Sequence, residues 1–351
     1  MIRNTLRNVL SRAGDALSGR RTHEPAPAAA PSRTTLDLVA ETLRSDERSP
    51  GVLDADAFRG HAWYPLDTAF SALRRRLRAD PGWRYGPAQV CDRVQWTFDL
   101  LRDHAEVRGK AYCELGCGRH HPFGAAAVLF VNGAASALAL DIENIENPAR
   151  SAEALQDLLV EMLAFPDGWN WTGVTPAELS ERVRAFDLEA LRNGDLEAGL
   201  AGVPLRHALG DITAAGTVEE SSIDILTSYT VLEHFMDFDA TCAALSRMMR
   251  PGAVALHNVD LTDHRFLVAP DRFNEWSFLT EPDAWSDGLT NRLRASELRA
   301  GIEAAGFEIL HEKRIHRELP ADLRPRLAGR FAAMPDDELS CVNVHYVTRK
   351  P

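Results

Sequence analysis

The stretch AYCELGCGRHHPFG, residues 111–124, contains the residue types of a ligand-binding loop. It begins as an apolar strand, carries an acid at Glu114 near the end of that strand, and continues through Gly116 and Gly118. A dinucleotide-binding loop has a third glycine, which lets the next helix pack closely on the strand, but this sequence has His121 at that position. An acid at the strand end therefore favours a ligand with an ammonium group over a pyrophosphate.

Two further acids follow predicted strands. Asp141 comes 23 residues after Gly118, at the end of the apolar stretch ASALALDI, where a carboxylate can accept hydrogen bonds from both hydroxyls of a ribose. Asp211 ends the stretch LRHALGDI, where a carboxylate can accept a hydrogen bond from an adenine amino group. An ammonium, a ribose and an adenine together describe S-adenosylmethionine, which is the cofactor that the sequence predicts.

A third polar group, HNVDLTDH at residues 257–264, follows another apolar strand. Asp260, Asp263 and His264 would lie at the carboxyl edge of the sheet, where α/β proteins bind their ligands. They are candidates for a catalytic base that takes a proton from a hydroxyl acceptor. Two aspartates and a histidine are also plausible ligands for a divalent metal ion. A purely structural role, in which these groups fasten the loop after the strand, is the alternative.

Strands and helices alternate from residue 110 onward. Continuous apolar strands separated by helices predict an α/β fold with a doubly wound, mostly parallel sheet covered on both faces. The last two strands have no helical pattern between them, which predicts one antiparallel edge. Ser296 is the predicted N-cap of the helix at 295–307. The predicted strands lie at 111–115, 135–142, 205–212, 221–235, 253–261, 308–315 and 341–350.

The chain divides into three predicted parts. Residues 1–34 form a basic amphipathic segment followed by a Pro/Ala linker, and residues 35–109 form a helical extension. Residues 110–351 form the α/β domain, with a helical insertion at about 148–205.

Charge and cysteine content restrict the partners. The net charge of −12 argues against nucleic-acid binding, although residues 1–21 are basic. Residues 2–17 would contact an anionic membrane surface as an amphipathic helix, or pack as an ordinary N-terminal helix. Five scattered cysteines favour a reducing cytoplasm over a disulfide framework. We therefore expect a cytoplasmic protein, with a peripheral contact to the inner face of the membrane if residues 2–17 bind lipid.

The motifs ELGCG, ALDIE, GDI, IDILTSYTVLEHF and LSRMMRPGAVALHNVDL resemble the successive motifs of class I S-adenosylmethionine-dependent methyltransferases, over residues 110–350. The resemblance implies a Rossmann-like sheet of seven strands, with the last one antiparallel. It departs from the family at His120, where a glycine is common, and in the long segment between the second and third strands, which we interpret as a cover for the substrate. The implied contacts are Glu114, Gly116 and Gly118 for the methionine end, Asp141 for the ribose, Asp211 and Ile212 for the adenine, and Ser228 and Tyr229 for the sulfonium.

The predicted activity is O-methylation of a small molecule or a glycan-type acceptor. The segment RFNEWSFLTEPDAW, residues 272–285, is similar to segments in methyltransferases of bacterial glycan and natural-product pathways. Its Trp276, Phe278 and Trp285 would form a wall for a sugar, or pack in the core. A catalytically silent module that binds the cofactor or a partner is the main alternative function. The missing third glycine argues against a nucleotide-binding oxidoreductase.

Overall fold

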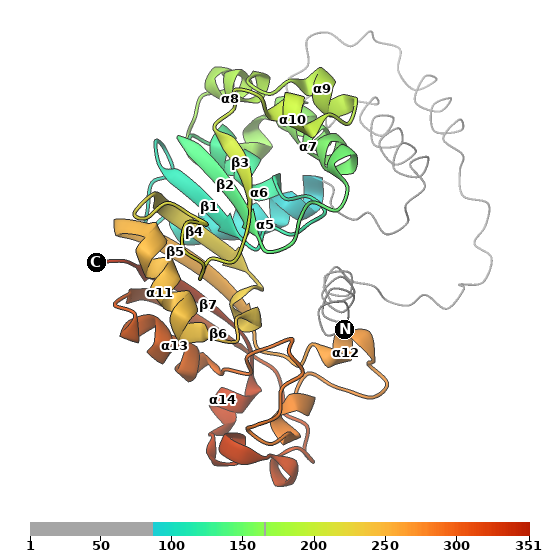
Figure 1. Ribbon diagram of the computed structural model, residues 1–351, viewed down its shortest axis with the longest axis vertical. Helices are drawn as coiled ribbons and strands as arrows, with labels where there is room; N and C mark the ends of the chain where they lie inside the picture. The colour runs from blue at the N-terminus through green and yellow to red at the C-terminus, as the bar shows by residue number, and fades with distance from the viewer. Residues whose placement is uncertain (1–86, 165) are drawn as a thin grey trace, which may run out of the picture.

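The computed structural model describes residues 87–164 and 166–351 (Figure 1). The amphipathic segment at 2–17, the linker at 22–34 and most of the predicted extension at 35–109 lie outside the described residues. The described part begins with the helix α5, Pro87–Leu101. None of the helices in the described part is both long enough and apolar enough to span a membrane.

The described strands form a single mixed sheet with the order β3-β2-β1-β4-β5-β7-β6. β1 pairs in parallel with β2 and β4, β2 with β3, and β4 with β5, whereas β7 is antiparallel to both β5 and β6. The predicted seven-stranded, doubly wound α/β fold is therefore confirmed. The strands are β1 Ala111–Leu115, β2 Ser136–Asp141, β3 Leu205–Leu209, β4 Ile223–Tyr229, β5 Met249–Asp260, β6 Glu308–His316 and β7 Cys341–Arg349.

The sheet has the predicted antiparallel edge, but the antiparallel strand β7 is not its outermost strand. It lies between β5 and β6, so β6 is the edge. β7 is buried along most of its length, whereas β6 is mostly half-buried or exposed. The apolar run VHYV in β7 and the charged run HEKR in β6 agree with this order, because an interior strand is covered on both faces.

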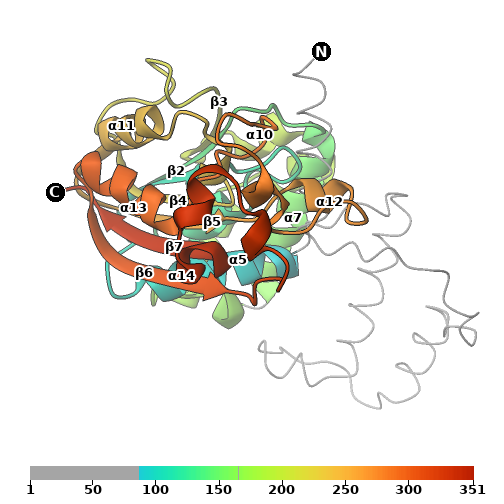
Figure 2. The same cartoon turned by 90° about the horizontal axis from the view of Figure 1, so that it is seen from below.

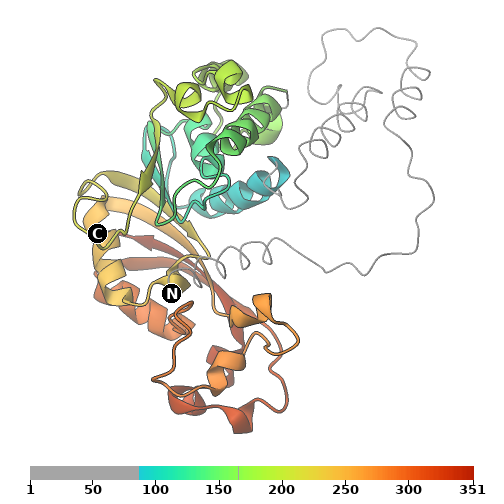
Figure 3. The ribbon, with the colours of Figure 1, turned by 45° about the vertical axis from the view of Figure 1, so that its right-hand side comes forward.

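Helices cover both faces of the sheet (Figures 1 and 3). α5 and α6 cover one face and share a core with it, and α11 and α13 cover the other. All eight residues of α6 are buried, which suits its uniformly apolar sequence GAAAVLFV. The remaining helices are α6 Gly124–Val131, α7 Pro148–Ala164, α8 Pro176–Arg184, α9 Leu188–Arg192, α10 Leu196–Leu200, α11 Phe238–Met248, α12 Arg265–Val268, α13 Ala295–Ala304 and α14 Asp336–Ser340.

The segment between β2 and β3 folds into α7, α8, α9 and α10. Leu155, Leu158 and Leu159 of α7 are fully buried and belong to the same core as α5 and α6. These helices therefore form an outer layer on the α6 side of the sheet (Figure 3).

A C-terminal lobe, which we define as residues 262–294 and 317–340, caps the sheet where β5 and β6 end and β7 begins (Figure 2). Its small core includes Trp276, Phe278 and Phe331. Trp276 and Phe278 are 8% and 2% exposed, so they pack in this core and the prediction that they line a sugar site is wrong. Trp285 is half-buried, with the guanidinium of Arg265 4.3 Å from its ring centre.

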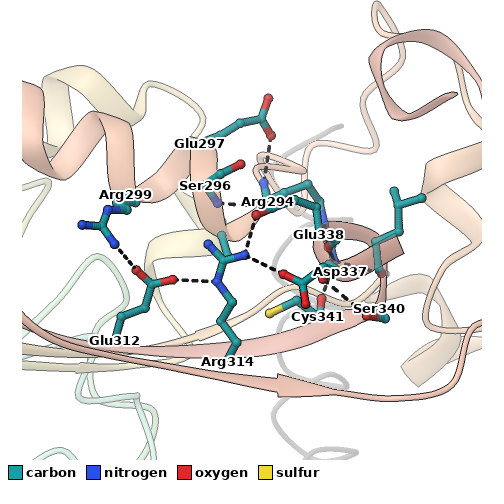
Figure 4. A network of polar contacts seen from close by, with 12 residues as sticks. Arg294, Ser296, Glu297, Arg299, Glu312, Arg314, Asp337, Glu338, Ser340 and Cys341 are labelled. Carbon is teal, nitrogen blue, oxygen red and sulfur yellow. Dashed lines mark hydrogen bonds and ion pairs between the residues drawn. The ribbon is translucent and has the colours of Figure 1, made fainter. Parts of the chain in front are cut away.

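Arg294 joins the lobe to the sheet (Figure 4). Its side chain is 1% exposed and donates hydrogen bonds to the backbone carbonyls of Leu261 at 2.7 Å, Glu338 at 2.9 Å, Leu339 at 3.2 Å, and Cys341. Burial lowers the pKa of Arg294 to about 10, so the side chain remains charged at neutral pH. One side chain thus holds the ends of β5 and α14 and the start of β7 together.

The same residue corrects the predicted helix cap. α13 begins at Ala295, and Arg294 is its N-cap residue, with its backbone N–H donating to Glu297 Oε2 at 2.9 Å. Ser296 lies inside the first turn and its N–H donates to Glu338 Oε2 at 3.1 Å, so the Ser296 cap prediction is wrong. The N-cap thus lies two residues before the predicted one, at Arg294, whose side chain is held by its tertiary contacts.

We expect Arg294→Met to lower the free energy of unfolding by about 3–5 kcal/mol, because several buried carbonyls would lose their donor at roughly 1–3 kcal/mol each. The matched control is Arg299→Met on the same helix, where an exposed arginine pairs with Glu303 and Glu312. Exposed ion pairs contribute about 0–1 kcal/mol. Urea unfolding of both variants measures the difference, and equal losses would contradict the role given to Arg294.

Candidate functional site

The loop after β1 is tied to the end of β2. Gly116 and Gly118 have φ angles of +72° and +80°, which glycine adopts at little cost. The Gly116 N–H donates to the Leu140 carbonyl and the Gly118 N–H to Asp141 Oδ2, both at 2.8 Å. A Cβ atom on Gly116 would lie 2.2 Å from Val231 Cγ2, whereas one on Gly118 would have no neighbour within 4 Å. Gly118 therefore lines open space, and Gly116 lets the loop approach the segment after β4.

Asp141 lies where the sequence places the ribose ligand. Its carboxylate accepts from the Gly118 N–H and, at 2.9 Å, from the Glu143 N–H. The next residue, Ile142, is 70% exposed. Leu209, the residue of β3 that pairs with Asp141 of β2, is 54% exposed. Two exposed aliphatic side chains beside this acid could pack on a flat ring such as adenine. Sequence reasoning did not identify either residue, although both directly adjoin predicted strand ends.

The residues predicted to contact the adenine differ in their exposure. Asp211 is exposed and accepts from the N–H and the hydroxyl of Thr213, at 2.8 and 2.7 Å. Ile212 is 3% exposed and packs in the core on the α11 side. The Asp211 carboxylate therefore stabilises the turn that follows β3. The side chain of Ile212 is buried, so this residue could contact a ligand only through its backbone.

Glu114 is buried and paired. Its side chain is 2% exposed, and its Oε1 lies 2.7 Å from Nη2 of Arg93 on α5. Burial raises the pKa of Glu114 to about 7, while the charge of Arg93 opposes this rise. Arg93 could not be predicted as a partner of Glu114, because no local pattern in its own segment shows which strand end α5 will reach.

Of the two residues predicted to lie beside the sulfonium, only Tyr229 has a solvent-exposed side chain. Ser228 is fully buried, and its hydroxyl lies 2.7 Å from His257 Nδ1 in a hydrogen bond. Tyr229 is 38% exposed, with Trp96 packed edge-on at 5.6 Å between ring centres. The Arg93 guanidinium lies 5.3 Å from the centre of the Tyr229 ring. The end of β4 therefore presents an aromatic ring.

The polar group after β5 divides into two parts. Asp260 accepts from the Thr262 N–H and hydroxyl, and its Oδ2 lies 3.6 Å from His264 Nε2. Burial would raise the pKa of Asp260, but His264 and Thr262 hold it below its usual value. Asp263 is fully buried and held by Arg265, whose Nη2 lies 2.6 Å from Oδ2. The carboxylate of Asp263 is thus engaged by Arg265, which favours the structural alternative for this residue.

The same ion pair bears on the metal hypothesis. Within residues 87–164 and 166–351, no group of three or more His, Cys, Asp or Glu side chains is arranged to hold a metal ion. Asp263 would have been the third ligand, but its oxygens are used by Arg265. The set Asp260, Asp263 and His264 therefore does not fit a divalent cation.

Two residues of the LEH motif extend the Asp260–His264 pair. The rings of His234 and His264 lie 5.0 Å apart between centres. His234 Nδ1 lies 2.7 Å from the Leu289 carbonyl, and neither ring nitrogen of His264 makes a hydrogen bond to the described residues. Glu233 is 2% exposed, and burial and the charge of Asp260 raise its pKa well above the usual range. His234 belongs to the stretch IDILTSYTVLEHF, which the sequence analysis identified. Only the fold shows that its ring packs against His264.

The two histidines after the glycine loop have different surroundings. His120 Nδ1 lies 2.8 Å from Glu146, and the Ser151 hydroxyl at the start of α7 donates to the His120 carbonyl at 2.8 Å. His121 is 7% exposed, so it is a buried residue of the loop. Burial and the nearby charge of Arg93 lower the pKa of His121 to about 4. Glu146 and Ser151, just before and at the start of α7, therefore hold the loop at His120, the position where the family commonly has a glycine.

We expect Asp141→Ala to weaken binding of the predicted cofactor by about 30- to 1,000-fold. This range corresponds to about 2–4 kcal/mol for the loss of two charge-assisted hydrogen bonds to a ribose. Calorimetric titration with S-adenosylhomocysteine measures the effect. The matched control is Asp187→Ala, since Asp187 also accepts from two backbone N–H groups but at the start of α9. Wild-type affinity in Asp141→Ala would refute the ribose assignment.

Residues 83–312, more than half of the chain, match a family model described as a methyltransferase domain. A probable S-adenosylmethionine-dependent methyltransferase of Mycolicibacterium smegmatis is 27% identical over 133 residues, which cover 38% of this chain and 46% of that protein. The match thus spans less than half of this relative.

Solved structures with a similar chain course include an S-adenosylmethionine-dependent methyltransferase from Mesorhizobium loti, with 16% identity, 73% and 97% of the two chains covered and a TM-score of 0.40. Another is geranyl diphosphate C-methyltransferase from Streptomyces coelicolor, with 9% identity, 73% and 79% covered and a TM-score of 0.41. Likenesses this distant give no information on the acceptor. The family match establishes that the chain belongs to the methyltransferase domain family, and the strand order of the sheet agrees with it.

Proposed function

We propose that this enzyme methylates an oxygen atom of an uncharged, hydroxylated acceptor, either a small molecule or a glycan-type compound. The observation that carries the proposal is the group formed by His234, Asp260 and His264 at the carboxyl ends of β4 and β5. A hydroxyl is a weak nucleophile until a base takes its proton, so an O-methyltransferase benefits from such a group.

The cofactor supplies an activated methyl group on its sulfonium, and the protein must align the acceptor and receive its proton. Burial and the charge of His264 lower the pKa of His234 to about 4, so this ring is neutral at pH 7. Its Nδ1 lies against the Leu289 carbonyl, which requires an N–H on that atom and leaves Nε2 as the proton acceptor. His234 is half-buried, and the buried carboxylate of Asp260 can stabilise the positive charge that this ring gains with the proton.

The surroundings of Tyr229 suit an uncharged acceptor. Trp96, Tyr229 and Asn343 are partly exposed, and Asn258 and His345 are buried behind them. The Trp96 indole donates to His345 Nδ1 at 3.2 Å, and the Asn343 amide donates to Asn258 Oδ1 at 2.8 Å. Burial and a nearby lysine lower the pKa of His345 to about 4, so it is neutral. Aromatic faces and amides of this kind pack on and hydrogen-bond to hydroxylated rings.

The test is the identity of the methylated atom. Methyl-labelled S-adenosylmethionine would be supplied with panels of sugars, polyols, phenols and amines, and the product examined by NMR. We expect an O-methyl product. An N-methyl or C-methyl product would contradict the proposal, and cofactor binding without transfer to any acceptor would favour the silent-module alternative.

A further inference from the structure

We propose that Arg93 binds the carboxylate of the cofactor's amino-acid end, while Glu114 accepts its ammonium group. The inference rests on the use of S-adenosylmethionine by this family and on placing its methionine end at the end of β1. It adds a residue from α5, outside the strand-end motifs, to the cofactor site.

The first argument is the position of the guanidinium. Arg93 Nη2 lies 2.7 Å from Glu114 Oε1, and the two side chains are 31% and 2% exposed. The carboxylate is thus enclosed, whereas the arginine side chain remains partly exposed. The guanidinium also lies 5.3 Å from the centre of the exposed Tyr229 ring. Arg93 therefore spans the mouth of the site from the end of β1 to the end of β4.

The second argument is the unused donor capacity. A guanidinium has five N–H donors, and among the described residues Arg93 makes an ion pair with Glu114 alone. Its planar fork matches the two oxygens of a carboxylate. The contrast is Arg294, whose guanidinium is committed to four backbone carbonyls.

The third argument is the chemistry of the ligand. An α-amino acid carries its ammonium and its carboxylate on the same carbon, so a site for it must offer an anion and a cation side by side. Glu114 and Arg93 are such a pair, next to the loop in which Gly118 faces open space. A ligand ammonium at Glu114 also supplies the positive charge that this buried acid needs, so Arg93 can turn toward the ligand carboxylate.

Three ligands separate this role from a structural one. S-adenosylhomocysteine carries both charged groups, its decarboxylated analogue keeps the ammonium alone, and 5′-methylthioadenosine has neither. At about 1.5–3 kcal/mol for hydrogen bonds to a charged group, Arg93→Gln should weaken S-adenosylhomocysteine about 10- to 100-fold. The other two ligands should change by no more than about twofold. Arg93→Lys keeps the positive charge beside Glu114 and should give a smaller loss.

The matched control is Arg102→Gln, since Arg102 directly follows α5 and pairs with an exposed acid, Asp99, at 3.0 Å. Its affinity for all three ligands should equal that of the wild type. Equal weakening of all three ligands by Arg93→Gln would overturn the proposal, because the arginine would then only hold α5 against β1. Unchanged affinity for S-adenosylhomocysteine would also overturn it. If the wild type bound none of the three, the cofactor assignment itself would be wrong.

Discussion

Gly116→Val should abolish cofactor binding. Position 116 has a φ of +72°, where a β-branched residue is strongly disfavoured, and its Cβ would lie 2.2 Å from Val231 Cγ2. The loop after β1 would have to move away from the segment after β4, and the backbone that receives the cofactor would move with it. We expect no measurable binding of S-adenosylhomocysteine by calorimetry, with the far-ultraviolet circular dichroism of a folded α/β protein retained.

Two further variants separate the steric clash from backbone strain. Gly109 has a similar φ of +73° but would place a Cβ in open space, so Gly109→Val should lower stability while leaving cofactor affinity unchanged. Combining Gly116→Ala with Val231→Ala removes the methyl groups that clash and should restore part of the binding lost in Gly116→Ala. Full binding in Gly116→Val would show that the loop does not form the cofactor site.

His264→Ala and Asp260→Asn should each lower turnover by about 10²- to 10⁴-fold, the usual contribution of general-base catalysis. Cofactor affinity should stay within about twofold of the wild type, because neither residue belongs to the loops after β1 and β2. His234→Gln should give a loss of the same size, since His234 Nε2 is the proposed proton acceptor. Turnover of each variant would be measured at saturating cofactor with the acceptor identified by NMR.

The pH profile gives an independent readout. The pKa of His234 is lowered to about 4, so the base is unprotonated throughout the neutral range and kcat should fall only as the pH drops toward that value. EDTA should leave turnover unchanged, because the described residues offer no metal site. The matched control is His311→Ala on β6, which should keep full activity. Full turnover in both His264→Ala and His234→Gln would mean that this cluster is structural.

The sequence predicted the sheet and the ends of β1 and β2 because these depend on local pattern, whereas the strands predicted at 205–212 and 221–235 end earlier, at Leu209 and Tyr229. Apolar runs in β1, β2 and β4 are bounded by turn residues, and the glycines at 116 and 118 are needed where φ is positive. Asp141 follows its strand directly, so its place at the carboxyl edge follows from the chain order alone. The family and the cofactor could be predicted for the same reason.

The tertiary structure determined which of these polar side chains remain available to a ligand. Asp263 is taken by Arg265 and Ser228 by His257, so two predicted site residues have their side chains occupied. Side-chain packing also determined the role of the aromatic residues in segment 272–285, since Trp276 and Phe278 lie in the core of the C-terminal lobe.

The contacts that define the proposed site join segments far apart in the chain. Arg93 reaches Glu114 because α5 packs across the ends of the strands, and His234 meets His264 because the loops after β4 and β5 converge. Local pattern thus determined where strands end and which acids follow them. The docking of helices and loops determined which of those acids are paired, because ion pairs and ring contacts depend on distances that no local pattern records.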